Sequence, residues 1–379
     1  MIPLARPNFG REEEEACAEV LRSGWVAQGP TTAEFEKEFA AEIGVPHAIA
    51  TSSCTTALHL AVIAAGVGPG DEVVLPSYTF PATANAVLYE QGTPVLADIE
   101  RSTLNLDPED MIRAITPRTK AVIAVHLFGC PCKIEEIERI CEDRGIFLIE
   151  DAACAVGTEA ATRKAGSFGQ IACFSFHARK VVSTGEGGML TTRDGTIAEL
   201  MRSLRTHGAD RAAEAREKEG AAPASAQYVR LGYNYRLSDV LSAVGRVQLR
   251  RLSAFVEERN RLARRYDEAL ASLPGLRLPP RISKGVHSYQ SYVIVLDPGA
   301  PIEPIPLMAA LAKSGVSTRV GTYAVHRQPY FRELADKRPL PASEEAAERS
   351  ISLPIYNGLL EKDQDVVIEA MRKAWKSGS

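Results

Sequence analysis

The chain has 379 residues, of which 45% are apolar and 24% are charged, and its net charge is −4. This is the average profile of soluble proteins, and it excludes a disordered, collagen-like or disulfide-built chain. There is no basic stripe and no apolar run of about 20 residues, which argues against nucleic-acid binding and against a membrane span. The N-terminus has no apolar signal core and turns acidic early, so we expect a cytoplasmic protein.

Seven cysteines are scattered over the first half of the chain. An odd number without a regular framework is typical of reduced thiols in a cytosolic protein. Cys130 and Cys132 form the only close pair, but one intervening residue is not a usual zinc spacing and no second pair accompanies them. We therefore expect two ordinary thiols there and no metal.

Short apolar runs alternate with helical stretches from about residue 45 to 195. We expect strands within 46–52, 68–77, 93–99, 120–127 and 146–151, and helices at 55–66, 81–90, 107–115 and 133–145. The strands are nearly continuous in Val, Ile and Leu, which is typical of strands buried on both faces of a parallel sheet. Their alternation with helices predicts βαβ crossovers and a doubly wound α/β layer.

The alternation of apolar runs and helical stretches ends at about residue 195. A helix is expected at 197–208, and the stretch 209–227, rich in Ala, Glu and Lys, is interpreted as a mobile surface loop. A long amphipathic segment over 238–272 is interpreted as a spine between two domains, and a proline-rich break then precedes a smaller α+β segment. We predict a large domain of residues 1–245 and a small domain of residues 246–379.

Two ionisable residues follow the ends of apolar runs that are predicted to be strands. Asp151 ends the run IFLIED, and a carboxylate at that place is costly unless it meets a partner. It is either a helix cap or solvated acid, or a carboxylate held against a cationic ligand group. Lys180 lies between an apolar run and the glycine-rich turn 185–188. It is either a surface lysine or a desolvated amine that attacks a carbonyl and forms a Schiff base.

Two further features fit the same ligand. The turn TSSCTT (51–56) opens a helix, where backbone N–H groups and hydroxyls bind phosphate, unless it is a plain helix cap. Phe80 follows a strand and offers a flat face, unless it packs in the core. Together the four features predict pyridoxal 5′-phosphate, whose aldehyde, phosphate, ring nitrogen and ring face they match.

The sequence also resembles the DegT/DnrJ/StrS sugar aminotransferases, which are fold-type I pyridoxal-phosphate enzymes. The resemblance spans nearly the whole chain, from IPLARPNFG (2–10) and LRSGWVAQGPTTAEFE (21–36) to LPIYNGLLEKDQDVVIEAM (353–371). Its most specific stretches are FSFHARKVVSTGEGGM and LGYNYRLSD (231–239). It implies an α/β fold whose large domain has a mostly parallel, seven-stranded sheet flanked by helices, with a smaller α+β C-terminal domain.

The resemblance also implies roles for single residues. Lys180 would carry the cofactor as a Schiff base, Asp151 would pair with the pyridine nitrogen, and Phe80 would stack on the ring. These are the catalytic pair and the ring contact of the predicted site.

Phosphate binding is implied for another set of residues. Ser175, five residues before the lysine, would bind the phosphate together with the backbone at Cys54 and Thr55. Asn234 would reach the phosphate from the partner subunit. The site would then be shared between two subunits, and the homodimer would be the catalytic unit.

Three positions need separate treatment. The family usually has glycine where Cys54 stands, and a side chain there requires a negative φ angle. It usually has Gln or His where Cys154 stands, and cysteine is a weaker hydrogen-bond donor toward the ring hydroxyl. His177 is expected to support the site rather than to act as the base, because Lys180 already suits that role.

The resemblance therefore predicts a transaminase that converts a keto group at carbon 3 or 4 of a nucleotide-linked sugar to an amine, with glutamate as donor, in polysaccharide or antibiotic biosynthesis. A cyclitol (inosose-type) aminotransferase is an alternative with the same chemistry. A pyridoxal-phosphate sugar dehydratase is disfavoured because such relatives have histidine in place of Lys180. The negative net charge and the complete cofactor set disfavour a non-enzymatic regulator.

Overall fold

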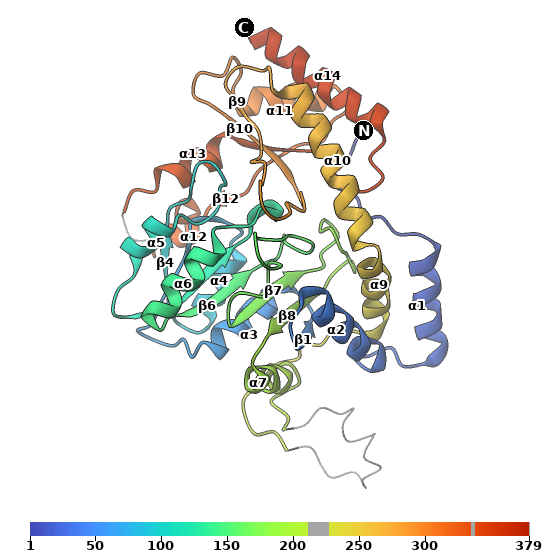
Figure 1. Cartoon of the computed structure of the whole chain (residues 1–379), viewed down its shortest axis with the longest axis vertical. Coiled ribbons are helices and arrows are strands. Elements are labelled where there is room, and N and C mark those ends of the chain that lie inside the picture. Colours follow the sequence, from blue (N-terminus) through green and yellow to red (C-terminus); the bar gives the residue numbers. More distant parts are fainter. Residues whose placement is uncertain (211–226, 335–337, 379) are drawn as a thin grey trace.

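The protein is described by a computed structural model that covers residues 1–210, 227–334 and 338–378. The loop expected at 209–227 therefore lies almost wholly outside the described residues. A large α/β layer forms the lower part of Figure 1, and a smaller sheet with its helices lies above it. Within the described ranges, no helix combines the length and the apolar character that a bilayer-spanning segment needs.

The large layer is built on a seven-stranded sheet with the strand order β1-β8-β7-β6-β5-β2-β4. Its strands are β1 (His47–Thr51), β2 (Glu72–Pro76), β4 (Thr93–Ala97), β5 (Thr119–Val125), β6 (Phe147–Asp151), β7 (Ile171–Ser175) and β8 (Gly188–Thr192). Only β8 runs against its neighbours β1 and β7, while the other adjacent pairs are parallel. The predicted mostly parallel sheet is confirmed.

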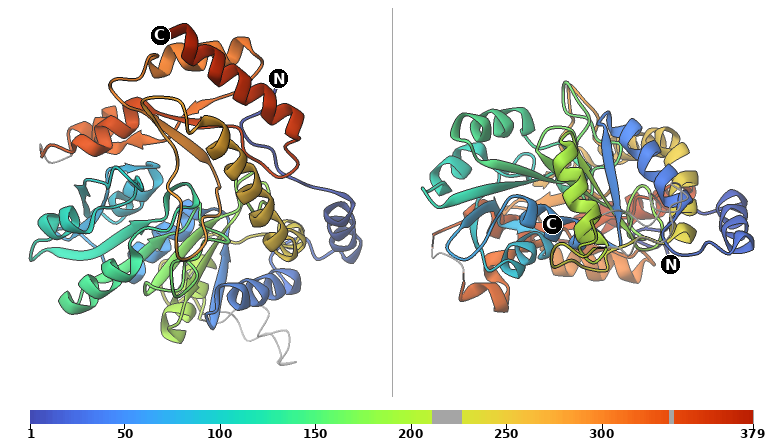
Figure 2. Two further views of the ribbon diagram at one scale, coloured as in Figure 1. Left: turned by 45° about the horizontal axis from the view of Figure 1, so that its top comes forward. Right: turned by 90° about the horizontal axis from the view of Figure 1, so that it is seen from below.

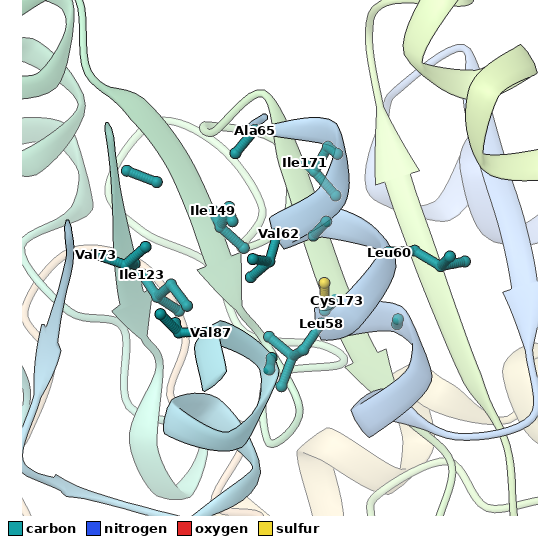
Figure 3. Close-up of a cluster of buried hydrophobic side chains, with 14 of the residues drawn as sticks. Leu58, Leu60, Val62, Ala65, Val73, Val87, Ile123, Ile149, Ile171 and Cys173 are labelled. Carbon is teal, nitrogen blue, oxygen red and sulfur yellow. The ribbon is translucent and has the colours of Figure 1, made fainter. Parts of the chain in front are cut away.

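Helices cover both faces of this sheet. They are α2 (Pro30–Ile43), α3 (Cys54–Ala64), α4 (Ala82–Tyr89), α5 (Pro108–Ala114), α6 (Ile134–Arg144) and α7 (Gly195–Arg205), whereas α1 (Arg11–Ser23) lies at the periphery of the layer (Figure 1). Successive residues of β5 alternate between the two faces: Ile123 belongs to the core under α3 and α4, and Val122 to the core under α5 and α6. Figure 3 shows the first of these cores, where Leu58 and Val62 of α3 lie over Ile149 of the sheet.

The smaller part has an antiparallel sheet with the order β11-β13-β10-β9. Its strands are β9 (Leu276–Arg277), β10 (Tyr292–Leu296), β11 (Arg319–Val320) and β13 (Ser350–Leu353). Its helices are α11 (Pro304–Lys313), α13 (Pro341–Arg349) and α14 (Glu361–Gly378), whereas Phe331 of the short helix α12 (Pro329–Arg332) belongs to the core under α3 and α4. This arrangement confirms the expected smaller α+β part.

The expected spine consists of two helices. α9 (Asp239–Arg250) packs beside α1 and α2, and after a break at Arg251 the helix α10 (Leu252–Leu270) rises to the smaller sheet (Figures 1 and 2). The predicted boundary at 245/246 falls inside α9, and the division into residues 1–245 and 246–379 stays a prediction. A second connection is a two-stranded sheet in which β3 (Tyr78–Thr79) pairs with β12 (Tyr323–Ala324).

Candidate active site

A cavity of about 300 Å³ lies at the carboxyl ends of the parallel strands, between the large sheet and the smaller part. This is the size of a site for a small molecule. Seven of the eight residues that the sequence predicted line it: Cys54, Thr55, Phe80, Asp151, Cys154, Ser175 and Lys180.

Strand topology explains why these residues meet. β6 ends at Asp151 and β7 ends at Ser175, and the two strands are parallel neighbours. β1 leads directly into α3, whose first residue is Cys54. Parallel strands end at the same edge of a sheet, so short segments that are distant in sequence come together there.

Lys180 follows β7 and points its amine into the cavity. Its Nζ lies 3.1 Å from Sγ of Cys154, to which it donates a hydrogen bond. Burial lowers the pKa of the Lys180 ammonium, but the sulfurs of Cys154 and Cys54 and the carboxylate of Asp151 raise it, and the net pKa lies above its ordinary value. With its pKa above the ordinary value, Lys180 must lose a proton before it attacks a carbonyl, and its role as the Schiff-base amine stays a prediction.

Asp151 is 4% exposed, so it is not a solvated acid. No helix begins directly after it, so it is not a helix cap either. Its Oδ2 accepts a hydrogen bond of 2.8 Å from the Thr83 hydroxyl, and its Oδ1 accepts one of 3.2 Å from the Ala153 N–H. Burial raises the pKa of Asp151 above its ordinary value, against the opposing effect of these donors and of Lys180. A cationic group placed opposite it would favour the ionised form.

The N-terminus of α3 provides an anion cradle. The N-cap Ser53 accepts a hydrogen bond from the Thr56 N–H, whereas no acceptor among the described residues takes the N–H groups of Cys54 and Thr55. Free N–H groups at a helix N-terminus bind phosphate. Ser175 adds a hydroxyl to the same cavity.

The backbone explains how a cysteine replaces the usual glycine in this turn. Cys54 is helical and is not among the residues with positive φ, so a side chain is tolerated there. The glycine that matters here is Gly188 of the glycine-rich turn. Its backbone lies so close to α3 that an added Cβ would be 2.5 Å from the carbonyl carbon of Ser53. The glycines after Lys180 thus let β8 pass directly beside the anion cradle.

Phe80 is 58% exposed although it is aromatic, which excludes core packing and leaves its ring available at the cavity. His177 also lines the cavity, and its Nε2 lies 3.9 Å from Oε1 of Glu186. Burial lowers the pKa of His177. Its expected supporting role stays a prediction.

Asn234 is the one predicted residue that does not line the cavity of its own chain. Its side chain is exposed, and its neighbours Tyr233 and Tyr235 stack on each other with ring centroids 4.8 Å apart. Tyr235 Oη lies 3.1 Å from Nδ1 of the buried His59, whose Nε2 lies 2.7 Å from Glu90. These contacts hold the segment against α3 and leave Asn234 facing outward.

Sequence reasoning missed several residues of the cavity. Thr83, which orients Asp151, stands in the quoted stretch TFPATANAV, but nothing local marks it as a partner of a carboxylate 68 positions away. Arg319 enters from the smaller part through β11, within the segment 319–331 that is interpreted from the sequence as lining the sugar pocket.

The residues present fit pyridoxal phosphate: an amine, a buried carboxylate, an exposed aromatic face and a cradle of free N–H groups share one cavity. Comparison with known proteins agrees. A model of the DegT/DnrJ/EryC1/StrS aminotransferase family matches residues 7–372.

Individual proteins match over nearly their whole length. The spore coat polysaccharide biosynthesis protein SpsC of Bacillus subtilis is 39% identical over 378 residues, which cover 98% of this chain and 96% of SpsC. The aminotransferase TlmJ of Streptoalloteichus hindustanus is 35% identical with a TM-score of 0.92, and the match covers 100% of this chain and 99% of TlmJ. The pyridoxal-phosphate form of the sugar aminotransferase Spr1654 of Streptococcus pneumoniae, described as putative, is 25% identical with a TM-score of 0.91 over 100% of this chain and 99% of Spr1654. The chain therefore belongs to the DegT/DnrJ/EryC1/StrS aminotransferase family and is an aminotransferase whose cofactor is pyridoxal phosphate.

Proposed function

We propose that this sugar aminotransferase converts the keto group at carbon 3 or 4 of a nucleotide-linked hexose to an amine and takes the amino group from glutamate. The observation that carries the proposal is the cavity itself, in which Lys180, Asp151 and the free N–H groups of α3 face the same space. The relative SpsC is named for polysaccharide biosynthesis, which supports a product destined for a polysaccharide.

When bound, pyridoxal phosphate supplies an aldehyde that takes up the amino group and a ring that accepts electrons. We assign to Lys180 Nζ both the covalent attachment of the cofactor and, once freed, the transfer of a proton to and from the carbon that carries the amine. Asp151 holds a proton at the ring nitrogen, and Thr83 and the Ala153 N–H keep its two oxygens in place for that task.

The remaining contacts bind and orient. The N–H groups of Cys54 and Thr55 and the hydroxyl of Ser175 would hold the phosphate, and Phe80 would cover one face of the ring. Cys154, which accepts a hydrogen bond from Lys180, stands where the ring hydroxyl is contacted in the family.

The working unit in this proposal is a homodimer in which Asn234 reaches the phosphate of the partner's site. The exposure of Asn234 and its absence from its own cavity support this arrangement. Exposed apolar side chains in the same segment, Tyr228 at 67% and Leu231 at 84%, support burial against a second copy. We also propose a cytoplasmic location, which the seven free cysteines support.

The test is a substrate panel. Purified enzyme loaded with pyridoxal phosphate is offered glutamate together with 3-keto and 4-keto nucleotide hexoses and an inosose, and the amino product is identified by its mass. We expect an amino sugar from one of the nucleotide hexoses and no product with Lys180→Ala. Amination of the inosose alone would replace this proposal by the cyclitol alternative, and loss of a hydroxyl without gain of nitrogen would replace it by the dehydratase.

A further inference from the structure

We propose that Arg319 binds the α-carboxylate of the amino donor and thereby selects an amino acid for the first half of the reaction. This inference rests on the proposed function, because it assigns a residue to the donor named there. It gives a role to a residue of the segment 319–331, which is interpreted from the sequence as part of the sugar pocket without a role for any of its residues.

Arg319 is a cation of the cavity wall that lacks a carboxylate partner. Its Nη2 donates a hydrogen bond of 2.6 Å to the Tyr323 hydroxyl, and its guanidinium lies 5.7 Å from the centroid of the Tyr323 ring. Across the described ranges it forms no ion pair, and its Nε and Nη1 donate to no acceptor. A half-buried guanidinium with unused donors at a ligand cavity is a ready partner for a planar anion.

The backbone around Arg319 is fixed. β11 pairs with β13, with Arg319 opposite Ser352. The chain then passes through Gly321, where an added Cβ would lie 2.4 Å from the Tyr78 hydroxyl and 2.5 Å from the Ser350 hydroxyl. Only glycine permits this approach, so the turn after Arg319 is clamped between the two parts of the molecule.

A continuous series of contacts joins Arg319 to the catalytic carboxylate. Tyr323, which holds the guanidinium, pairs with Thr79 in the β12–β3 sheet. The Thr79 and Thr83 hydroxyls lie 3.0 Å apart, and the Thr83 hydroxyl donates to Asp151. The position of Arg319 relative to the cofactor site is therefore set by the fold and not by a free side chain on the surface.

The chemistry favours a carboxylate of the donor over the diphosphate of the sugar nucleotide. In an amino acid the α-carboxylate is bonded to the same carbon as the reacting amine, so it must lie in the same small cavity as Lys180. The diphosphate is attached to carbon 1 of the sugar, which is not bonded to the keto carbon of a 3- or 4-keto hexose and is separated from it by at least one ring carbon. Among the other cations of the wall, Lys180 is needed for the reaction and Arg179 is exposed.

The experiment separates the two half-reactions of the holoenzyme. The first is the glutamate-driven loss of the cofactor's pyridoxal absorbance in a single turnover, and the second is steady-state turnover with the keto-sugar varied at saturating glutamate. Arg319→Gln and Arg319→Lys are compared with wild type and with Arg332→Gln, a matched control at an exposed arginine that donates a hydrogen bond to the Arg327 carbonyl.

We expect Arg319→Gln to raise the half-saturating glutamate concentration about 10- to 100-fold, the effect of one lost charge-assisted hydrogen bond. Arg319→Lys restores part of this loss, while cofactor content, the limiting rate and the KM for the keto-sugar stay within about twofold. A larger rise in the KM for the keto-sugar than for glutamate assigns Arg319 to the nucleotide and overturns the inference, as does unchanged glutamate dependence. If glutamate fails to convert the wild-type enzyme, it is the proposed donor that is wrong.

Discussion

At the scale of single residues, the cavity contains a carboxylate, Asp151, whose ionised form is disfavoured by burial. Asp151 is buried, and burial raises its pKa although Thr83, the Ala153 N–H and Lys180 all favour the ionised form. A protonated ring nitrogen opposite Asp151 would remove this conflict, because an opposite charge stabilises the carboxylate. Asp151 is therefore suited to a ligand that places a cation against it.

This gives a prediction for Asp151→Asn. Asparagine keeps an acceptor for Thr83, so we expect the fold and the melting temperature to change little. The ring nitrogen loses the group that keeps it protonated, and we expect kcat to fall by about 100- to 10,000-fold. Rate measurements and far-UV circular dichroism check both parts, and near-normal turnover by a folded variant would contradict the assignment.

Another buried titratable residue lies outside the catalytic set. His287 is 4% exposed, its ring stacks on Tyr289 at a centroid distance of 3.8 Å, and its Nδ1 accepts a hydrogen bond of 2.9 Å from the Tyr289 N–H. Burial lowers the pKa of His287 to about 3. The unfolded chain therefore binds this proton more readily than the folded one.

Burial of neutral His287 makes the folded protein less stable at low pH. His287 contributes stability above its ordinary pKa of 6.5, and this contribution is lost as the pH falls from 6.5 towards 3. In His287→Asn, whose amide oxygen can replace Nδ1 as the acceptor, we expect the free energy of unfolding to fall less steeply over this range, by about 1.4 kcal/mol per pH unit. Urea titrations between pH 7 and 4 measure the slope. An identical slope in His287→Asn and in the exposed-site control His207→Asn would refute the prediction.

At the scale of elements, the start of α2 is capped by a residue of another helix. Gly29, the N-cap of α2, has no side chain to offer. Asp239, the first residue of α9, accepts hydrogen bonds from the N–H groups of Gly29, Thr31 and Thr32 and from the Thr32 hydroxyl, at 2.6–2.9 Å. This residue is fully buried and is the last one of the stretch LGYNYRLSD.

We therefore expect Asp239→Ala to lower the free energy of unfolding by about 3 kcal/mol or more, because several buried donors lose their acceptor at once. The matched control is Asp194→Ala, which removes an exposed N-cap of α7 and should cost about 1 kcal/mol. Denaturant midpoints compare the two. Equal losses of unfolding free energy in the two variants would contradict the prediction that Asp239 stabilises the fold more than an ordinary helix cap.

At the scale of the whole molecule, Asn234 connects the fold to the proposed dimer. If it serves the partner's site, an Asn234→Ala chain and a Lys180→Ala chain fail in different places. In a heterodimer one of the two sites carries both defects and the other carries neither. When the two inactive variants are mixed, we expect each heterodimer to show up to about half of the activity of a wild-type dimer, because one of its two sites is intact.

The control for this experiment is a mixture of Asp151→Asn and Lys180→Ala chains. Both changes lie in the same cavity of one chain, so no heterodimer site is intact and no activity should return. Subunit exchange is verified with differently tagged chains. If exchange occurs and the Asn234→Ala mixture stays inactive, Asn234 acts within its own subunit.

Much of the architecture follows from local patterns in the sequence. The continuous apolar runs of β5 and β6 identify strands covered on both faces, because Val122 and Ile123 point to opposite faces of the sheet and each reaches an apolar core. Residues at strand ends, among them Asp151 and Ser175, could be named as a group because parallel strands end at one edge of the sheet.

What the sequence by itself determined is therefore the set of elements, the edge at which chemistry occurs and the amine and carboxylate that stand there. Only the tertiary structure decided that Thr83 holds Asp151, that Cys154 accepts a hydrogen bond from Lys180, and that Arg319 enters from the smaller sheet. Local propensity acts over a few residues, whereas these contacts join segments that are separated by 26 to 68 positions along the chain or that belong to different sheets. They depend on the packing of complete layers, which no short window of sequence records.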